Sequence, residues 1–119
     1  MFLYDFDDLA DLISQFWPEY AGSKYKGELD ECEILLASYM IEGYEGSAYV
    51  LYQKDGKLYE VFASHCSCMG LEGQWEPEET SVKAISLRLA ADSYYHRGHE
   101  VELAGVLAGL SASNSGKVN

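Results

Sequence analysis

The residues best suited to chemistry are His65, Cys66 and Cys68, which stand within four positions of one another. Imidazole and thiolate groups are ligands that zinc prefers, and Cys32 would complete a Cys3His set. The spacing is Cys-x-Cys rather than the Cys-x-x-Cys of a zinc knuckle, and the fourth ligand comes from far away in the chain. A small zinc-stabilised binding module is therefore our second hypothesis. The simpler alternative is a strand end whose small side chains pack under Trp75, with no cofactor.

The same segment offers little for catalysis. A nucleophilic Cys66 would need a thiolate stabilised by positive charge, whereas the sequence around it is neutral to acidic. In an extended strand the side chains of His65 and Cys66 would also point to opposite faces. Glu60 is the one carboxylate expected in a half-buried setting, and a charge that protects a sheet edge from aggregation explains it more simply. We expect the protein not to be an enzyme.

The acidity of the chain is its other chemical feature. Twenty Asp and Glu face eight Lys and Arg, a formal net charge of -12, and residues 1–33 alone carry -7. This charge opposes direct binding to nucleic acid or to an anionic membrane, but it suits a Lys/Arg-rich surface of a protein. A solvated face that only confers solubility is the alternative. The residues expected to bind the partner are Asp7, Asp8, Asp11, Glu28, Asp30, Glu31, Glu72, Trp75, Glu76, Glu78 and Glu79.

The elements that would position these side chains begin with an amphipathic helix over residues 5–17. Its apolar stripe contains Phe6, Leu9, Ala10, Ile13, Phe16 and Trp17. Asp5 is the expected cap of the first turn, and Pro18 ends the helix. A loop over residues 18–32 follows.

Three strands are expected next, over residues 33–42, 48–53 and 57–64. The pair Asp55-Gly56 favours a two-residue type I′ hairpin, which sets Tyr52 opposite Tyr59 and Leu51 opposite Glu60. The strands would form a three-stranded antiparallel meander. Its tyrosine-rich face is either covered or offered to a partner.

Two helices complete the expected fold. The first starts at a Thr80 or Ser81 cap and ends at Gly98, and the second runs from about His99 to Leu110. Residues 1–110 are then a single α+β domain, and residues 111–119 a disordered tail. Inward positions of the last helix are Val101, Ala104, Leu107 and Ala108. Gly105 and Gly109 would permit close approach of a second helix, so a homodimer is possible.

The remaining composition bears on location. Three cysteines do not make a disulfide scaffold, and an odd count fits a reduced compartment. The chain shows neither a signal-peptide pattern nor an apolar run of about 18 residues. We expect a cytoplasmic protein that does not span a membrane.

Two runs carry a resemblance to a known group of proteins. They are residues 46–61, GSAYVLYQKDGKLYEV, and residues 64–80, SHCSCMGLEGQWEPEET. Over residues 33–89 the chain resembles a family of small phage and prophage proteins, mostly described as hypothetical. Met69 stands where the family would have an aromatic residue, and Phe62-Ala63 replaces a more polar pair.

The resemblance implies a context rather than an active site. Small acidic phage proteins often inhibit host machinery, including as anti-CRISPR and anti-restriction proteins, and some act as DNA mimics. Our first hypothesis is a phage-encoded inhibitor in the bacterial cytoplasm. It would bind a basic surface of a host nuclease or CRISPR surveillance protein through its acidic, DNA-mimicking residues.

Overall fold

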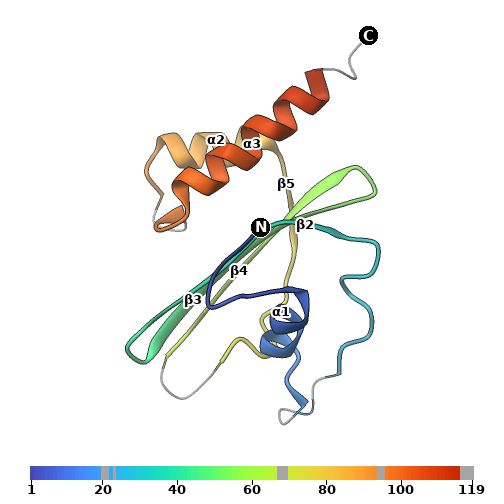
Figure 1. Cartoon of the computed structure of the whole chain (residues 1–119), viewed down its shortest axis with the longest axis vertical. Coiled ribbons are helices and arrows are strands. Elements are labelled where there is room, and N and C mark those ends of the chain that lie inside the picture. Colours follow the sequence, from blue (N-terminus) through green and yellow to red (C-terminus); the bar gives the residue numbers. More distant parts are fainter. Residues whose placement is uncertain (20–21, 23, 67–69, 94–95, 116–119) are drawn as a thin grey trace. The chain divides into compact units, whose positions relative to one another are not determined.

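The computed structural model describes residues 1–19, 22, 24–66, 70–93 and 96–115. The chain divides into two compact units, Met1–Glu79 and Thr80–Asn119, and each is described by itself. The first unit holds most of a five-stranded mixed sheet and one helix, and the second holds two helices (Figure 1). The α+β class expected from the sequence is confirmed. The single domain over residues 1–110 stays a prediction.

The centre of the sheet is the expected antiparallel meander of β2 (Glu33–Glu42), β3 (Glu45–Lys54) and β4 (Lys57–His65). Asp55 and Gly56 have φ angles of 52° and 77°, as a type I′ turn requires. The predicted register is confirmed, with Tyr52 opposite Tyr59 and Leu51 opposite Glu60. The turn chemistry therefore determines which side chains share a face of this sheet.

The three-stranded count was wrong, because short strands lie at both edges of the sheet. β1 (Phe2–Tyr4) pairs in parallel with β2, and β5 (Glu78–Thr80) is the neighbour of β4. The backbone of Met1 accepts a hydrogen bond from the Ala37 N–H at 2.8 Å. A three-residue strand is too short to show alternation, and its parallel partner lies more than thirty positions away.

The first helix is shorter than expected. α1 spans Leu9–Phe16, and its N-cap is Asp8 rather than Asp5. The chain before it turns at Tyr4, where φ is 61°, and the Asp5 N–H donates to the Tyr39 carbonyl at 2.9 Å. Phe6 therefore reaches the core from the segment before the helix and not from the helix itself. Its helical spacing from Leu9 and Ala10 could not reveal this.

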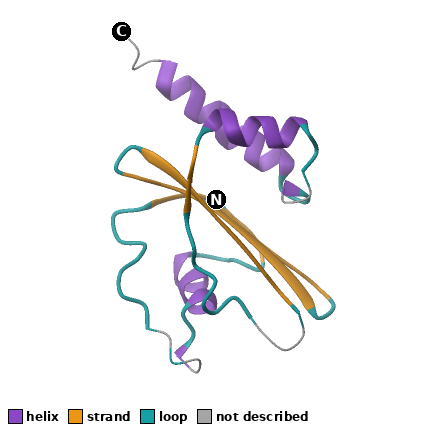
Figure 2. Ribbon diagram, turned by 180° about the vertical axis from the view of Figure 1, so that it is seen from behind, coloured by secondary structure: helices purple, strands orange, loops and turns teal. Residues whose placement is uncertain are grey.

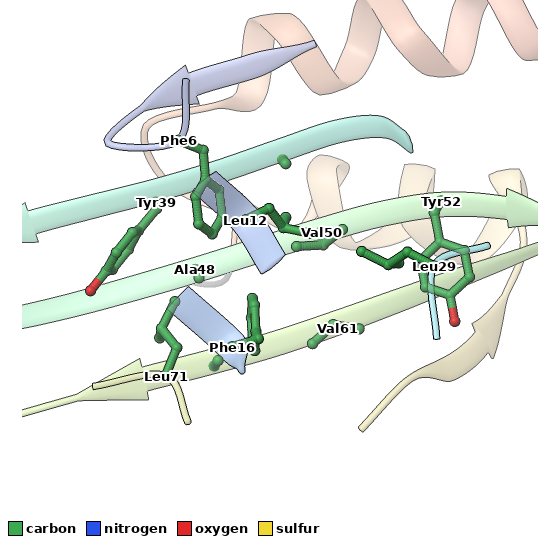
Figure 3. Close-up of a cluster of buried hydrophobic side chains, with 12 residues drawn as sticks. Phe6, Leu12, Phe16, Leu29, Tyr39, Ala48, Val50, Tyr52, Val61 and Leu71 are labelled. Carbon is green, nitrogen blue, oxygen red and sulfur yellow. The ribbon is translucent and has the colours of Figure 1, made fainter. Parts of the chain in front are cut away.

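The hydrophobic core of the first unit lies between α1 and one face of the sheet (Figures 2 and 3). The members of this cluster are Phe6, Leu12, Phe16, Leu29, Ala37, Tyr39, Ala48, Val50, Tyr52, Val61, Ala63 and Leu71. Tyr39 lies at one end of the cluster, and Tyr52 with Leu29 at the other (Figure 3). Tyr39, Tyr49 and Tyr52 are all at least 95 % buried, so these three tyrosines of the sheet are covered.

The second unit consists of α2 (Val82–Ala90) and α3 (Glu100–Ser115). Ser81 caps α2 as expected, its side chain accepting from the Ala84 N–H at 3.1 Å. α2 ends eight residues before the predicted stop at Gly98, and α3 continues five residues past Leu110. Tyr94 and Tyr95, expected near the end of the first of these helices, lie outside the described residues.

The inward face predicted for the last helix is largely wrong. Leu107 is buried as expected, but Val101 is 82 % exposed and Ala104 and Ala108 are exposed. Leu103 is buried in their place. Many small residues surround the few large ones, so periodicity defined the face poorly. Gly105 and Gly109 have open space around them, and the homodimer stays a prediction.

Burial changes the acid–base chemistry of His99, in the second unit. It is 97 % buried, and its ring lies 5.7 Å from that of His96. Burial first, and then the neighbouring imidazole, lower the pKa of His99 to about 4, against the smaller opposing effects of Glu100 and Glu102. The imidazole is therefore neutral at pH 7.

Among the described residues, no helix has both the length and the apolar character needed to cross a membrane.

Candidate functional site

The acidic residues before and within α1 cap that helix. Asp8 accepts from the Asp11 N–H at 2.8 Å, and Asp11 accepts from the Asp7 N–H at 3.1 Å. The N–H groups of Asp7 and Asp11, which have no acceptor within the helix, are both hydrogen-bonded in this way. Both carboxylates also lie at the positive end of the helix dipole. Asp8 and Asp11 therefore stabilise α1 whatever else they do. The exposed Asp7 contributes only its backbone to this arrangement.

A second group of carboxylates organises the loop before β2. Glu28 accepts from the Lys26 N–H at 2.6 Å, and Asp30 accepts from the Tyr25 hydroxyl at 3.4 Å. The Tyr25 oxygen in turn accepts from the Leu29 N–H at 3.0 Å. Glu31, at a φ of 64°, is exposed on the outside of this loop.

These two acidic groups lie at opposite ends of α1. At the start of the helix, the Phe6 ring contacts that of Tyr39, with centroids 5.1 Å apart. At its end, Trp17 contacts Tyr25 at the same centroid distance, and Tyr25 holds Asp30. The eight residues of α1 span about 12 Å. The predicted partner-binding acids of residues 1–33 are thus two groups that flank one helix.

Trp75 does not stand out from the surface as an anchor among the acids of residues 72–79. Its ring contacts Phe16 at 5.0 Å, Trp17 at 5.2 Å and Tyr52 at 5.8 Å. The Gln74 side chain fixes the preceding turn by donating to the Ser64 carbonyl at 2.8 Å. Trp75 is therefore half-buried and packs against the core.

The acids around Trp75 differ in exposure. Glu76, Glu78 and Glu79 are exposed, and Glu78 and Glu79 belong to β5. Glu72 is half-buried, and its Oε2 has no hydrogen-bond partner among the described residues. The second acidic concentration is therefore presented by residues 76–79 rather than by Glu72.

The structure places two members of the predicted zinc set, Cys32 and His65, far apart. Cys32 packs against the core and its thiol donates to the Glu28 carbonyl at 3.7 Å. Its neighbour Glu33 pairs with Gln53, whereas His65 pairs with Gly46 at the other end of β3. Seven residues of strand separate those positions by about 23 Å, while zinc binds its ligands at about 2.0–2.3 Å. Cys32 therefore cannot share a metal with His65.

Both nitrogens of His65 are engaged within the protein. Nε2 lies 2.6 Å from the Tyr39 hydroxyl, and Nδ1 lies 3.0 Å from the Cys66 carbonyl oxygen. A carbonyl can only accept, so in the neutral ring Nδ1 carries the proton and Nε2 accepts from Tyr39. Cys68 lies outside the described residues. Within the described residues, no group of three or more His, Cys, Asp or Glu side chains is placed to hold a metal ion.

Glu60 is not the edge charge that the sequence favoured. β4 has neighbours on both sides, and Glu60 is 97 % buried. Its Oε2 accepts from the Tyr49 hydroxyl at 2.6 Å. A short, charge-assisted hydrogen bond of this kind offsets the burial of the carboxylate, which indicates a structural role.

The net charge is confined to one unit of the chain. Residues 1–79 contain seventeen of the twenty acidic residues and four of the eight basic ones, a net of -13. Residues 80–119 contain three acidic and four basic residues, a net of +1. The acidic residues are concentrated near the start of the chain, and the second unit contributes nothing to the net negative charge.

Sequence reasoning missed a hollow beside α1. Its described lining comes from one side of the helix, at Ala10, Ile13, Ser14 and Trp17, and from the loop that includes Tyr25. Helical spacing assigned Ala10, Ile13 and Trp17 to the buried stripe. Ile13 and Trp17 are instead partly exposed. The sequence signal that could have indicated this is Tyr25, an aromatic residue in the loop that follows the helix.

No protein-family model, curated protein or solved structure matches this chain.

Proposed function

We propose that this protein acts by binding rather than by catalysis. Its acidic first unit would occupy a Lys/Arg-rich surface of a nucleic-acid-handling protein, such as a nuclease or CRISPR surveillance complex of a bacterial host. The observation that carries the proposal is the net charge of -13 on Met1–Glu79 beside +1 on the rest of the chain. Solubility alone has no need of such an asymmetry, whereas a surface for a basic partner does.

The exposed acids around α1 are the proposed contact surface. The two groups lie near the two ends of α1, whose eight residues span about 12 Å. Because the hydrogen bonds of Asp8, Asp11 and Glu28 restrict their rotamers before binding, these side chains lose less entropy when a partner binds. In the partner's groove, these carboxylates would take the place of the phosphates of a nucleic acid.

The same hydrogen bonds decide which substitutions test the proposal. Reversing the charge of Asp8 or Asp11 would also remove a helix cap, so lost binding could reflect lost folding. Glu31 and Glu33 are both exposed, and Glu33 lies at the first position of β2. The variant Glu31→Lys/Glu33→Lys therefore changes the surface charge with little effect on stability.

The chain offers a matched control. Glu42 and Glu45 are exposed and lie at the opposite end of β2, about 30 Å from Glu33 over nine residues of strand. Glu42→Lys/Glu45→Lys changes the net charge by the same amount. Since charges separated by more than about 8 Å are largely screened at physiological salt, a change at Glu42 and Glu45 has little effect at Glu31 and Glu33.

The experiment is affinity capture from a bacterial host lysate, with captured proteins identified by mass spectrometry. We expect the wild type and the Glu42/Glu45 variant to retain a basic nucleic-acid-handling protein, and the Glu31/Glu33 variant to lose it. Capture that is equal for all three proteins, or equally lost in both variants, would contradict the proposed surface.

A further inference from the structure

The hollow beside α1 is large enough for a ligand group. Its volume is about 760 Å³, within the range of about 300–1,000 Å³ that is usual for ligand sites. It is formed within the first unit, beside the edge of the core, from Ile13 and Trp17 of α1 and from described residues of the following loop that include Tyr25. It therefore lies between the two acidic groups that flank α1.

Aromatic rings form its best-defined wall. Trp17 and Tyr25 meet edge to face, with centroids 5.1 Å apart and an interplanar angle of 71°. Trp17 also contacts Phe16 and Trp75, with centroids 6.1 and 5.2 Å away, and this packing restricts the motion of its ring. The faces of Trp and Tyr rings carry negative quadrupole potential, which attracts a cation within about 6 Å.

The charges around the rings are those that a cation requires. The Tyr25 hydroxyl donates to Asp30, and its pKa is raised by burial and by the negative charge of Asp30 and Glu28. Two charged residues line the hollow itself, the exposed Glu19 and the exposed Lys24. Glu19, Glu28 and Asp30 outnumber Lys24 and Lys26 by one charge, so the local charge is negative.

We propose that this hollow is a binding site for a guanidinium group, the arginine side chain of a basic protein partner, held against the Trp17 and Tyr25 rings and paired with Glu19. Arginine suits such a site because its planar, weakly hydrated cation stacks on aromatic rings while it pairs with a carboxylate. The inference rests on the proposed function, and it adds where and how one residue of the partner is recognised.

The test is an NMR titration of the full-length protein with N-acetyl-arginine amide. N-acetyl-citrulline amide, which has nearly the same shape and no charge, is the control. We expect the arginine compound to shift the Trp17 indole N–H resonance saturably in the millimolar range, and the citrulline compound to leave it unchanged. Equal shifts with both compounds, or no shift with either, would overturn the inference.

Two surface substitutions test the sign of the ligand's charge. We expect Glu19→Gln to weaken arginine binding by about twofold to fivefold and Lys24→Gln to strengthen it by about twofold. Both residues are exposed, so neither variant is expected to unfold the protein. The opposite ranking would mean that the hollow prefers an anion, and would refute the assignment.

The two proposals fail separately. If the acidic surface captures a basic partner and the arginine compound leaves Trp17 unchanged, the guanidinium site is refuted and the proposed function stands. If the arginine compound binds as expected and the Glu31→Lys/Glu33→Lys variant captures as well as the wild type, the acidic surface is refuted and the guanidinium site stands.

Discussion

The cap of α1 gives the sharpest test of how the acidic residues serve the fold. Asp8→Ala removes the acceptor of the Asp11 N–H, and loss of an N-cap of this kind costs about 1 kcal/mol. Because an isolated helix of eight residues is unstable, α1 depends on its cap and on the burial of Leu12 and Phe16. The cost should therefore appear in the unfolding of the first unit.

Asp8→Asn is the matched variant, since an amide oxygen can replace the carboxylate oxygen as the acceptor. It loses only the favourable interaction of the charge with the helix dipole, about 0.3 kcal/mol at an exposed site. In urea unfolding followed by tryptophan fluorescence, Asp8→Ala should lower the midpoint by about 0.5–1 M. Asp8→Asn should lower it by about 0.2 M. Equal losses in both variants would show that charge, and not the hydrogen bond, stabilises the helix, and no loss in either would refute the cap.

Three further predictions concern buried polar groups. Because the pKa of His99 is lowered to about 4, the protein should lose up to about 3 kcal/mol as the pH falls from about 6.5 to about 4, and His99→Gln should flatten that dependence in pH-resolved unfolding curves. Gly46→Ala places a Cβ where the His65 imidazole stands, so it should cost about 1–3 kcal/mol in thermal unfolding, whereas a neutral result would show that the ring is free to move. Tyr49→Phe removes a donor from the buried Glu60 carboxylate and should cost about 1–3 kcal/mol, and the double variant with Glu60→Gln should cost less than the sum of the two single changes.

The parts of the fold that the sequence predicted are those that local chemistry controls. Asp55-Gly56 determined a hairpin and with it the register of β3 and β4, because few residue pairs accept two positive φ angles. The ten residues of β2 were predicted with their observed bounds, since their neighbours were clear strands. A cap at Thr80 or Ser81 was predicted from the same kind of local hydrogen bonding, and Ser81 is the cap.

The parts that were missed depend on long-range contacts. β1 is a strand because it meets β2, and Phe6 is a core residue because a turn directs it inward. Burial of Glu60 required a partner, Tyr49, that lies diagonally across the β3–β4 pair. Cys32 and His65 were grouped by residue type, and the length of the hairpin separates them.

The candidate site was predicted in part. Residue types indicated where acidity is concentrated, but not that Asp8, Asp11, Glu28 and Asp30 accept backbone or tyrosine hydrogen bonds that order the structure. These bonds restrict the positions of carboxylates near both ends of α1.

The measurement that tests the central claim most directly is the salt dependence of binding to the captured partner. Affinity of the wild type should fall steadily as ionic strength rises from low to physiological salt and beyond, because screening weakens contacts between exposed charges. The Glu31→Lys/Glu33→Lys variant should bind more weakly and with a shallower dependence, while Glu42→Lys/Glu45→Lys should follow the wild type. Affinity that does not change with salt, or a dependence that all three proteins share, would contradict recognition through the acidic surface around α1.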